Sequence, residues 1–127
     1  MWSFTLQATN YFVSNADNNF NNGLTLNNAL QTLQHTSNQV AAGDTVFVED
    51  GTYVGFDHRN VSGTANAPIV FSAMGDNVLI SSTGCSTDVG YYFEDSDFII
   101  IDGFMVNDIL LDGDGIRFES ILAIGRL

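Results

Sequence analysis

The chain has 127 residues, 45% of them hydrophobic, which gives it the size and apolar content of one folded domain and not of two. Fifteen acidic residues oppose three arginines and no lysine. The resulting net charge of −12 argues against a nucleic-acid partner, because the cations that displace phosphate counterions are missing. No stretch approaches the roughly 20 apolar residues of a membrane span, and a single cysteine excludes an intramolecular disulfide.

The first third of the chain predicts a strand, a polar loop and a helix. Residues 11–14 form a short apolar run typical of a strand, and residues 15–22 are rich in Asn, which favours turns. Residues 28–41 are predicted as an amphipathic helix, with Asn28 as its N-cap and Gln31 completing the capping pair. A helix in this place would cover the open end of a solenoid.

A short apolar run recurs from residue 45 onward. Residues 46–48, 69–71, 91–93 and 116–118 follow one another at offsets of 23, 22 and 25 residues. One short strand per unit of this length is typical of a solenoid. Alternation within each run directs its first and third residues inward. The middle residues then form one outward column, made of Phe47, Val70, Tyr92 and Arg117.

A second column is predicted from residues 78–80, 98–101 and 122–124. Residues 53–54 begin either this column or a third, which residues 104–106 would join. Tandem short strands also suit an antiparallel sandwich, but the similarity of the units favours a parallel coil.

The predicted fold class is therefore an all-β solenoid, a parallel β-helix of about four rungs with an N-terminal capping α-helix. A single domain spans residues 1–127, with the strand, loop and capping helix in residues 9–43 and the rungs in residues 44–127.

Four motifs follow the strand, loop and helix in order. They are Gly-Asp-Thr-Val-Phe-Val-Glu-Asp-Gly-Thr-Tyr at 43–53, Ser-Gly-Thr-Ala-Asn-Ala-Pro-Ile at 62–69, Asp-Phe-Ile-Ile-Ile-Asp-Gly-Phe at 97–104 and Gly-Asp-Gly-Ile at 113–116. The series resembles the N-terminal coils of right-handed parallel β-helix proteins of the pectate-lyase-like superfamily. The resemblance implies a carbohydrate-active, secreted protein. Such lyases usually have more coils, so the chain is expected to be a short or truncated member.

The resemblance also directs the search for catalytic residues. β-Elimination from a uronate requires a base, a positive group on the carboxylate and a donor to the leaving oxygen. The family's lysine base has no counterpart here. Arg117 is interpreted as the only cation within a strand, either as a carboxylate clamp or as a surface ion pair with Glu119 or Asp114. With Tyr92 as a sugar-stacking platform, the predicted substrate-binding residues are Arg117, Tyr92 and Glu119.

Asp108, Asp112 and Asp114 are the candidate metal ligands, and Ca²⁺ is the one cofactor that they suggest, because carboxylate oxygens suit this ion. Their spacing lacks a complete calcium-loop pattern, and aspartates that form turns explain the same residues. His58, beside Asp57 in an expected loop, is a weak signal for a catalytic triad because no motif places a serine.

Three functions remain open from the sequence. The chain is a glycan-binding module, a self-associating unit, or a minimal calcium-assisted lyase of an acidic polysaccharide. The missing lysine and the small number of rungs favour the two non-catalytic functions. Apolar residues in the last rung, such as Ile116 and Leu122, predict a homo-oligomer, most simply a dimer.

Overall fold

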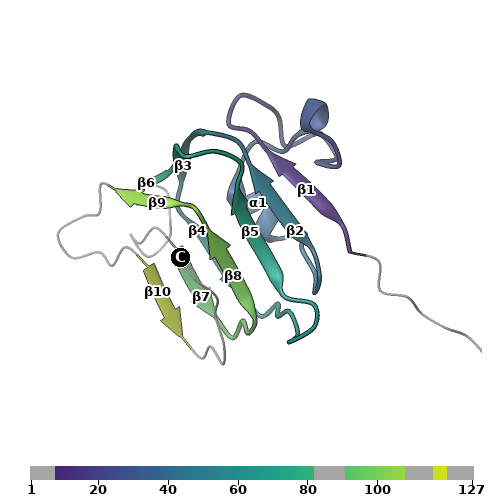
Figure 1. Cartoon of the computed structure of the whole chain (residues 1–127), viewed down its shortest axis with the longest axis vertical. Helices are drawn as coiled ribbons and strands as arrows, with labels where there is room; N and C mark the ends of the chain where they lie inside the picture. The colour runs from purple at the N-terminus through teal and green to yellow at the C-terminus, as the bar shows by residue number, and fades with distance from the viewer. Residues whose placement is uncertain (1–7, 82–90, 108–115, 120–127) are drawn as a thin grey trace, which may run out of the picture.

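The computed structural model describes residues 8–81, 91–107 and 116–119, and in them the chain winds as a coil of short strands (Figure 1). The elements, in chain order, are β1 (Asn10–Val13), the 3₁₀ turn η1 (Leu26–Asn28), α1 (Leu33–Ser37), β2 (Thr45–Val48), β3 (Gly51–Val54), β4 (Phe56–Arg59), β5 (Ile69–Ala73), β6 (Val78–Ser81), β7 (Tyr91–Glu94), β8 (Ile99–Asp102), β9 (Met105–Asn107) and β10 (Ile116–Glu119).

Three parallel sheets form the walls of the coil. Sheet A has the order β1-β2-β5-β8, sheet B the order β3-β6-β9, and sheet C the order β4-β7-β10. Every strand pair is parallel, which excludes the antiparallel sandwich. The chain passes from sheet A to B to C three times in the described residues, and β1 adds one further strand to sheet A. The described residues therefore contain three complete coils, where the sequence predicts about four rungs for the whole chain.

Alternate residues of each strand fill the interior. Val46, Phe71 and Ile101 occupy one register row across sheet A and are at most 1% exposed. Phe71 also packs on Phe56 of sheet C, with ring centroids 5.2 Å apart. Burying a side chain of this size contributes about 1.5–3 kcal/mol. The core thus joins opposite walls of the coil, and the predicted inward direction of Val46 and Phe71 is confirmed.

The predicted division into columns is wrong for two of the four apolar runs. Residues 46–48 and 69–71 do lie in neighbouring strands of sheet A. Residues 91–93 and 116–118 instead lie in sheet C, and residues 99–102 take the next place in sheet A. The strands β2, β5 and β8 begin at residues 45, 69 and 99, so the steps are 24 and 30 residues. A fixed spacing cannot follow coils of unequal length.

Sheet B confirms one of the two predicted alternatives for residues 53–54. These residues begin the column of residues 78–80, and residues 105–106 join it. The sequence also predicts residues 98–101 in this column, but residues 99–101 belong to β8 of sheet A. Residues 122–124, its last predicted member, lie outside the described residues.

The helix predicted over residues 28–41 is much shorter. It begins after Thr32, whose side-chain oxygen accepts a hydrogen bond from the His35 backbone N–H at 3.2 Å, and it ends at Ser37. Asn28 ends the 3₁₀ turn and caps no α-helix. Leu30 has extended pairing instead: its N–H donates to the Phe12 carbonyl at 2.9 Å, and its own carbonyl accepts from the Ser14 N–H at 2.8 Å. Pairing with the edge of β1 overrides the local helical preference.

Side-chain amides cover the N-terminal edges of the other two sheets. Gln34 Nε2 donates to the Asp57 carbonyl at 2.9 Å, while the Asp57 N–H donates to Gln34 Oε1 at 2.8 Å. A carboxamide has the same donor and acceptor as a peptide group, so Gln34 takes the place of a strand beside β4. Asn15 Nδ2 likewise donates to the Thr52 carbonyl of β3 at 3.1 Å.

Candidate functional site

The residues predicted to bind substrate lie in two neighbouring strands of sheet C, Tyr92 in β7 and Arg117 and Glu119 in β10. In β4, Phe56 and His58 are buried, so Asp57 and Arg59 take the outward positions of the alternation. The strand register then aligns the neighbouring strands with these two positions. One row is Asp57, Tyr92 and Arg117, and the other is Arg59, Glu94 and Glu119. We call these six positions the sheet C face.

Arg59 holds the described part of this face together. Its Nη1 lies 2.8 Å from Glu94 Oε2, and its Nη2 lies 3.2 Å from Asp57 Oδ2. The Arg59 side chain is 41% exposed, and ion pairs this accessible to water contribute only about 0–1 kcal/mol. Their main effect is to fix the plane of the guanidinium at the surface of the sheet.

The sequence analysis did not identify Arg59 as a residue of a strand. Its place in β4 shows that the interpretation of Arg117 as the only cation within a strand was wrong. Residues 56–59 read Phe-Asp-His-Arg, which resembles a polar loop if His is counted as polar. Counting His58 as an inward residue gives strict alternation with Phe56, and this signal could have identified the strand.

His58 is 1% exposed and lies in β4, not in a loop. Its Nδ1 lies 2.7 Å from Ser37 Oγ of α1, and its Nε2 lies 2.9 Å from the Val61 carbonyl oxygen. Burial lowers the pKa of His58 below its usual value, and the hydrogen bonds with Val61 and Ser37 oppose part of that shift. The hydrogen bond between His58 and Ser37 is buried and connects α1 to β4. Because Ser37 is buried, its hydroxyl is not accessible as a nucleophile for a polysaccharide.

The remaining predicted residues do not join the sheet C face. Phe47 and Val70, assigned to the same outward column as Tyr92, are on the outer side of sheet A. Asp108, Asp112 and Asp114 lie outside the described residues. Within residues 8–81, 91–107 and 116–119, no three His, Cys, Asp or Glu side chains gather as a metal site. No helix in this part of the chain has the length and apolar character needed to cross a membrane.

No protein-family model matches the sequence, and no curated protein matches it. Solved structures do match, and two of them are polysaccharide lyases by name. A rhamnogalacturonan lyase has a TM-score of 0.66 and 20% identity, and the alignment covers 92% of this chain and 37% of that one. Pectate lyase Pel9A has a TM-score of 0.61 and 21% identity, with coverage of 92% and 33%. The chain spans about a third of the length of these two lyases, and at this identity the likeness shows a shared fold.

Proposed function

We propose that this chain, which has the right-handed parallel β-helix fold of pectate-lyase-like proteins, binds an acidic polysaccharide on the sheet C face and does not cleave it alone. The two matching structures are named as lyases of rhamnogalacturonan and pectate, and this supports a polysaccharide as the ligand. The proposal rests on the sheet C face and not on the fold alone, because one fold serves many functions.

The observation that carries the proposal is the position of the arginines. Of the three cations in the chain, Arg59 and Arg117 lie in strands of the same sheet, with β7 between them. A chain of net charge −12 repels a polyuronate in general, and the arginines of β4 and β10 offset part of that repulsion at sheet C. A guanidinium binds a carboxylate through two parallel hydrogen bonds. Tyr92 holds the register position between Asp57 and Arg117, where an aromatic residue suits the apolar side of a sugar ring.

The same residues argue against catalysis by this chain alone. The sequence has no lysine, and the described residues bring no metal-binding cluster to the sheet C face. The alternative, a minimal calcium-assisted lyase, depends on Asp108, Asp112 and Asp114 and stays a prediction.

Binding to polygalacturonate, compared with the same polymer after reduction of its carboxyl groups, tests the proposal. Arg59→Gln and Arg117→Gln should each weaken binding of the acidic polymer about tenfold, the effect of losing a charge-assisted hydrogen bond. Arg126→Gln is the matched control, since it removes the same charge outside the described residues. An equal loss in all three variants, or equal binding of the reduced polymer, would reject the sheet C face as the site.

We also propose that the chain self-associates through the edge formed by β8, β9 and β10. Gln34 and Asn15 occupy the N-terminal edges of sheets C and B, as described above, whereas no described strand pairs with the far edges of β8, β9 and β10. An open strand edge is a template for another strand. A two-fold dimer is the simplest closed arrangement.

Light scattering over a dilution series tests this second proposal, with a dimer expected at micromolar concentration. The double variant Asn15→Ala with Gln34→Ala should open the other end and produce larger assemblies. Gln31→Ala, an exposed amide in the same region, is the control. A monomer at high micromolar concentration for all variants would contradict the proposal.

A further inference from the structure

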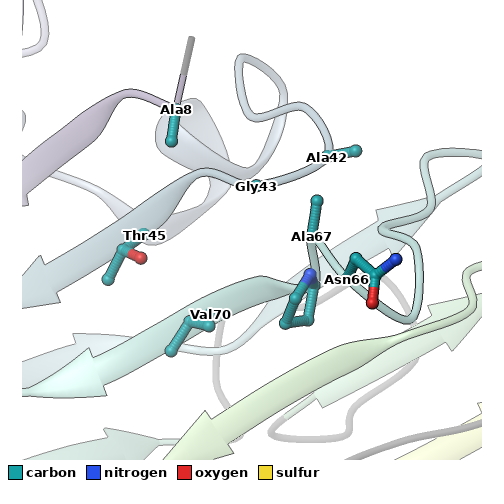
Figure 2. Close-up of a pocket in the computed structure, with 8 residues that line it drawn as sticks. Ala8, Ala42, Gly43, Thr45, Asn66, Ala67 and Val70 are labelled. Atoms are coloured by element: carbon teal, nitrogen blue, oxygen red, sulfur yellow. The ribbon is translucent and has the colours of Figure 1, made fainter. Parts of the chain in front are cut away.

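A pocket of about 390 Å³ opens beside strands β2 and β5 of sheet A, and none of its lining residues belongs to the sheet C face (Figure 2). Three segments that are distant in sequence form it: Ala8 before β1, the turn that leads into β2, and the loop that leads into β5. Thr45 and Val70, neighbours in the register of β2 and β5, form its side toward the strands. Its volume lies in the range of small-molecule sites.

Hydrogen bonds hold the walls of the pocket in place. Asp44 is 5% exposed, and its carboxylate accepts from the Thr9 N–H and the Ala41 N–H, each at 2.9 Å. This carboxylate therefore joins the segment before β1 to the turn before β2. On the opposite side, Thr64 and Ala67 exchange backbone hydrogen bonds of 3.0 and 3.1 Å, which close the third segment. These hydrogen bonds fix the three segments before a ligand binds, so binding costs little conformational entropy of the loops.

Glycine is required at the centre of the pocket. Gly43 has a φ of +89°, a conformation that other residues adopt only with strain. A Cβ at this position would lie 3.5 Å from the Ala67 methyl carbon and 3.8 Å from that of Ala8. The backbone turn at Gly43 thus brings methyl groups from two other segments to one place.

The side chains that line the pocket are mostly apolar and none is charged, and Thr45 and Asn66 supply its polar side chains. Figure 2 shows Thr45 and Asn66 on either side of Gly43 and Ala67. No Lys, Arg, Asp or Glu lines the pocket, although the chain carries 18 such residues, 15 of them acidic. A carboxylate would find no counter-charge here and would be repelled by the net charge of −12. A ligand with hydroxyl groups and an apolar side would hydrogen-bond with Thr45 and Asn66 and pack against the methyl groups of the lining.

Aromatic residues adjoin the pocket along the same face. Phe47 follows Thr45 by two residues on β2 and so lies on the same side of the sheet. Its ring stacks on Phe12 of β1, with centroids 5.5 Å apart and an interplanar angle of 26°. A second sugar unit bound to the first would therefore meet an aromatic surface.

We infer that this pocket, which we call the sheet A pocket, binds a neutral pyranose, and prefers one with a methyl group in place of a polar C6 substituent. This site is separate from the sheet C face and does not depend on the proposed binding of an acidic polysaccharide there. The methyl-lined middle receives the apolar side of the sugar, and Thr45 and Asn66 bind its hydroxyls.

Three sugars that differ only at C6 test the inference: 6-deoxygalactose, galactose and galacturonate. Amide and methyl NMR shifts are followed during titration to about 50 mM, since single sugars bind proteins weakly. Shifts at Ala42, Thr45, Ala67 and Val70 are expected, strongest for 6-deoxygalactose and weakest for galacturonate. Thr45→Val keeps the β-branched shape but removes the hydroxyl, and should weaken binding about fivefold.

Arg59→Gln is the control variant, because it alters the sheet C face and should leave these shifts unchanged. No shift at the four residues with any sugar, or galacturonate binding there as tightly as 6-deoxygalactose, would overturn the inference. Loss of polygalacturonate binding in Arg59→Gln, with the sheet A pocket still active, would separate the two sites. Failure of the sheet C proposal would likewise leave this result intact.

Discussion

Sheets A and C are built from the same three coils, yet the sheet A pocket and the sheet C face differ in chemistry. The outer side of sheet A carries a methyl-lined pocket and stacked phenylalanines, and no charged residue lines that pocket. The sheet C face carries alternating charges, with Arg59 fixed between Asp57 and Glu94. Inward positions are constrained by the core, whereas outward positions are not. One coil can therefore support two surfaces with different ligand preferences.

The largest expected effect comes from the interior that both sheets share. Phe71→Ala should lower the free energy of unfolding by about 3–5 kcal/mol, because it leaves a cavity between Val46 and Phe56. Phe47→Ala, on the outer side of the same sheet, is the matched control and should cost much less. Chemical denaturation measures both. A loss below about 1 kcal/mol for Phe71→Ala would mean that the interior does not join the two sheets as described.

Acid should destabilise the chain through His58, a buried residue of β4 in sheet C. Its pKa is lowered in the folded chain, so the unfolded chain takes up the proton first as the pH falls. The stability that His58 contributes is complete above its usual pKa of about 6.5 and is lost as the pH falls from there toward the folded value. Denaturation at pH 8 and pH 5 should show this loss in the parent chain but not in His58→Gln. His35→Gln, which removes the other imidazole of the chain, is the control variant. An unchanged pH dependence in His58→Gln would assign the acid sensitivity elsewhere.

Ionic strength should affect binding at one surface only. Raising the salt from about 0.01 M to 1 M shortens the screening length from about 30 Å to 3 Å. Polygalacturonate binding at the sheet C face should weaken by at least tenfold over this range, since it depends on arginine charges. Binding of 6-deoxygalactose in the sheet A pocket should stay within twofold, because no charged residue lines that pocket. Equal salt dependence for the two ligands would show that they share one surface.

The smallest expected effect is in catalysis. We expect no unsaturated uronate from pectate, alginate or chondroitin, with or without Ca²⁺, because the chain has no lysine to serve as the base. Ultraviolet absorbance of the unsaturated product is the measurement. Product that disappears in Arg117→Ala would restore the lyase interpretation and make the sheet C face an active site.

The sequence by itself determined the local features of this fold. Short apolar runs separated by Gly and Asp turns predicted most of the described strands, although β4 was expected as a loop. Alternation predicted the inward side of Val46 and Phe71, because a strand's own geometry fixes it. The first strand and the parallel coil were also predicted correctly. The strands and their alternation depend on neighbours a few residues away, whereas the parallel coil was inferred from the recurrence of similar units along the chain.

Only the tertiary structure decided which strands stack. The assignment of Tyr92 and Arg117 to the sheet of Arg59, and not to that of Phe47, depends on coils of unequal length, and no local pattern encodes the length of a coil. Leu30 is extended and not helical because it pairs with the edge of β1. The sheet A pocket likewise exists because three distant segments converge at Gly43. Such features follow from contacts between residues that are distant in sequence, and the pattern of neighbouring residues does not predict those contacts.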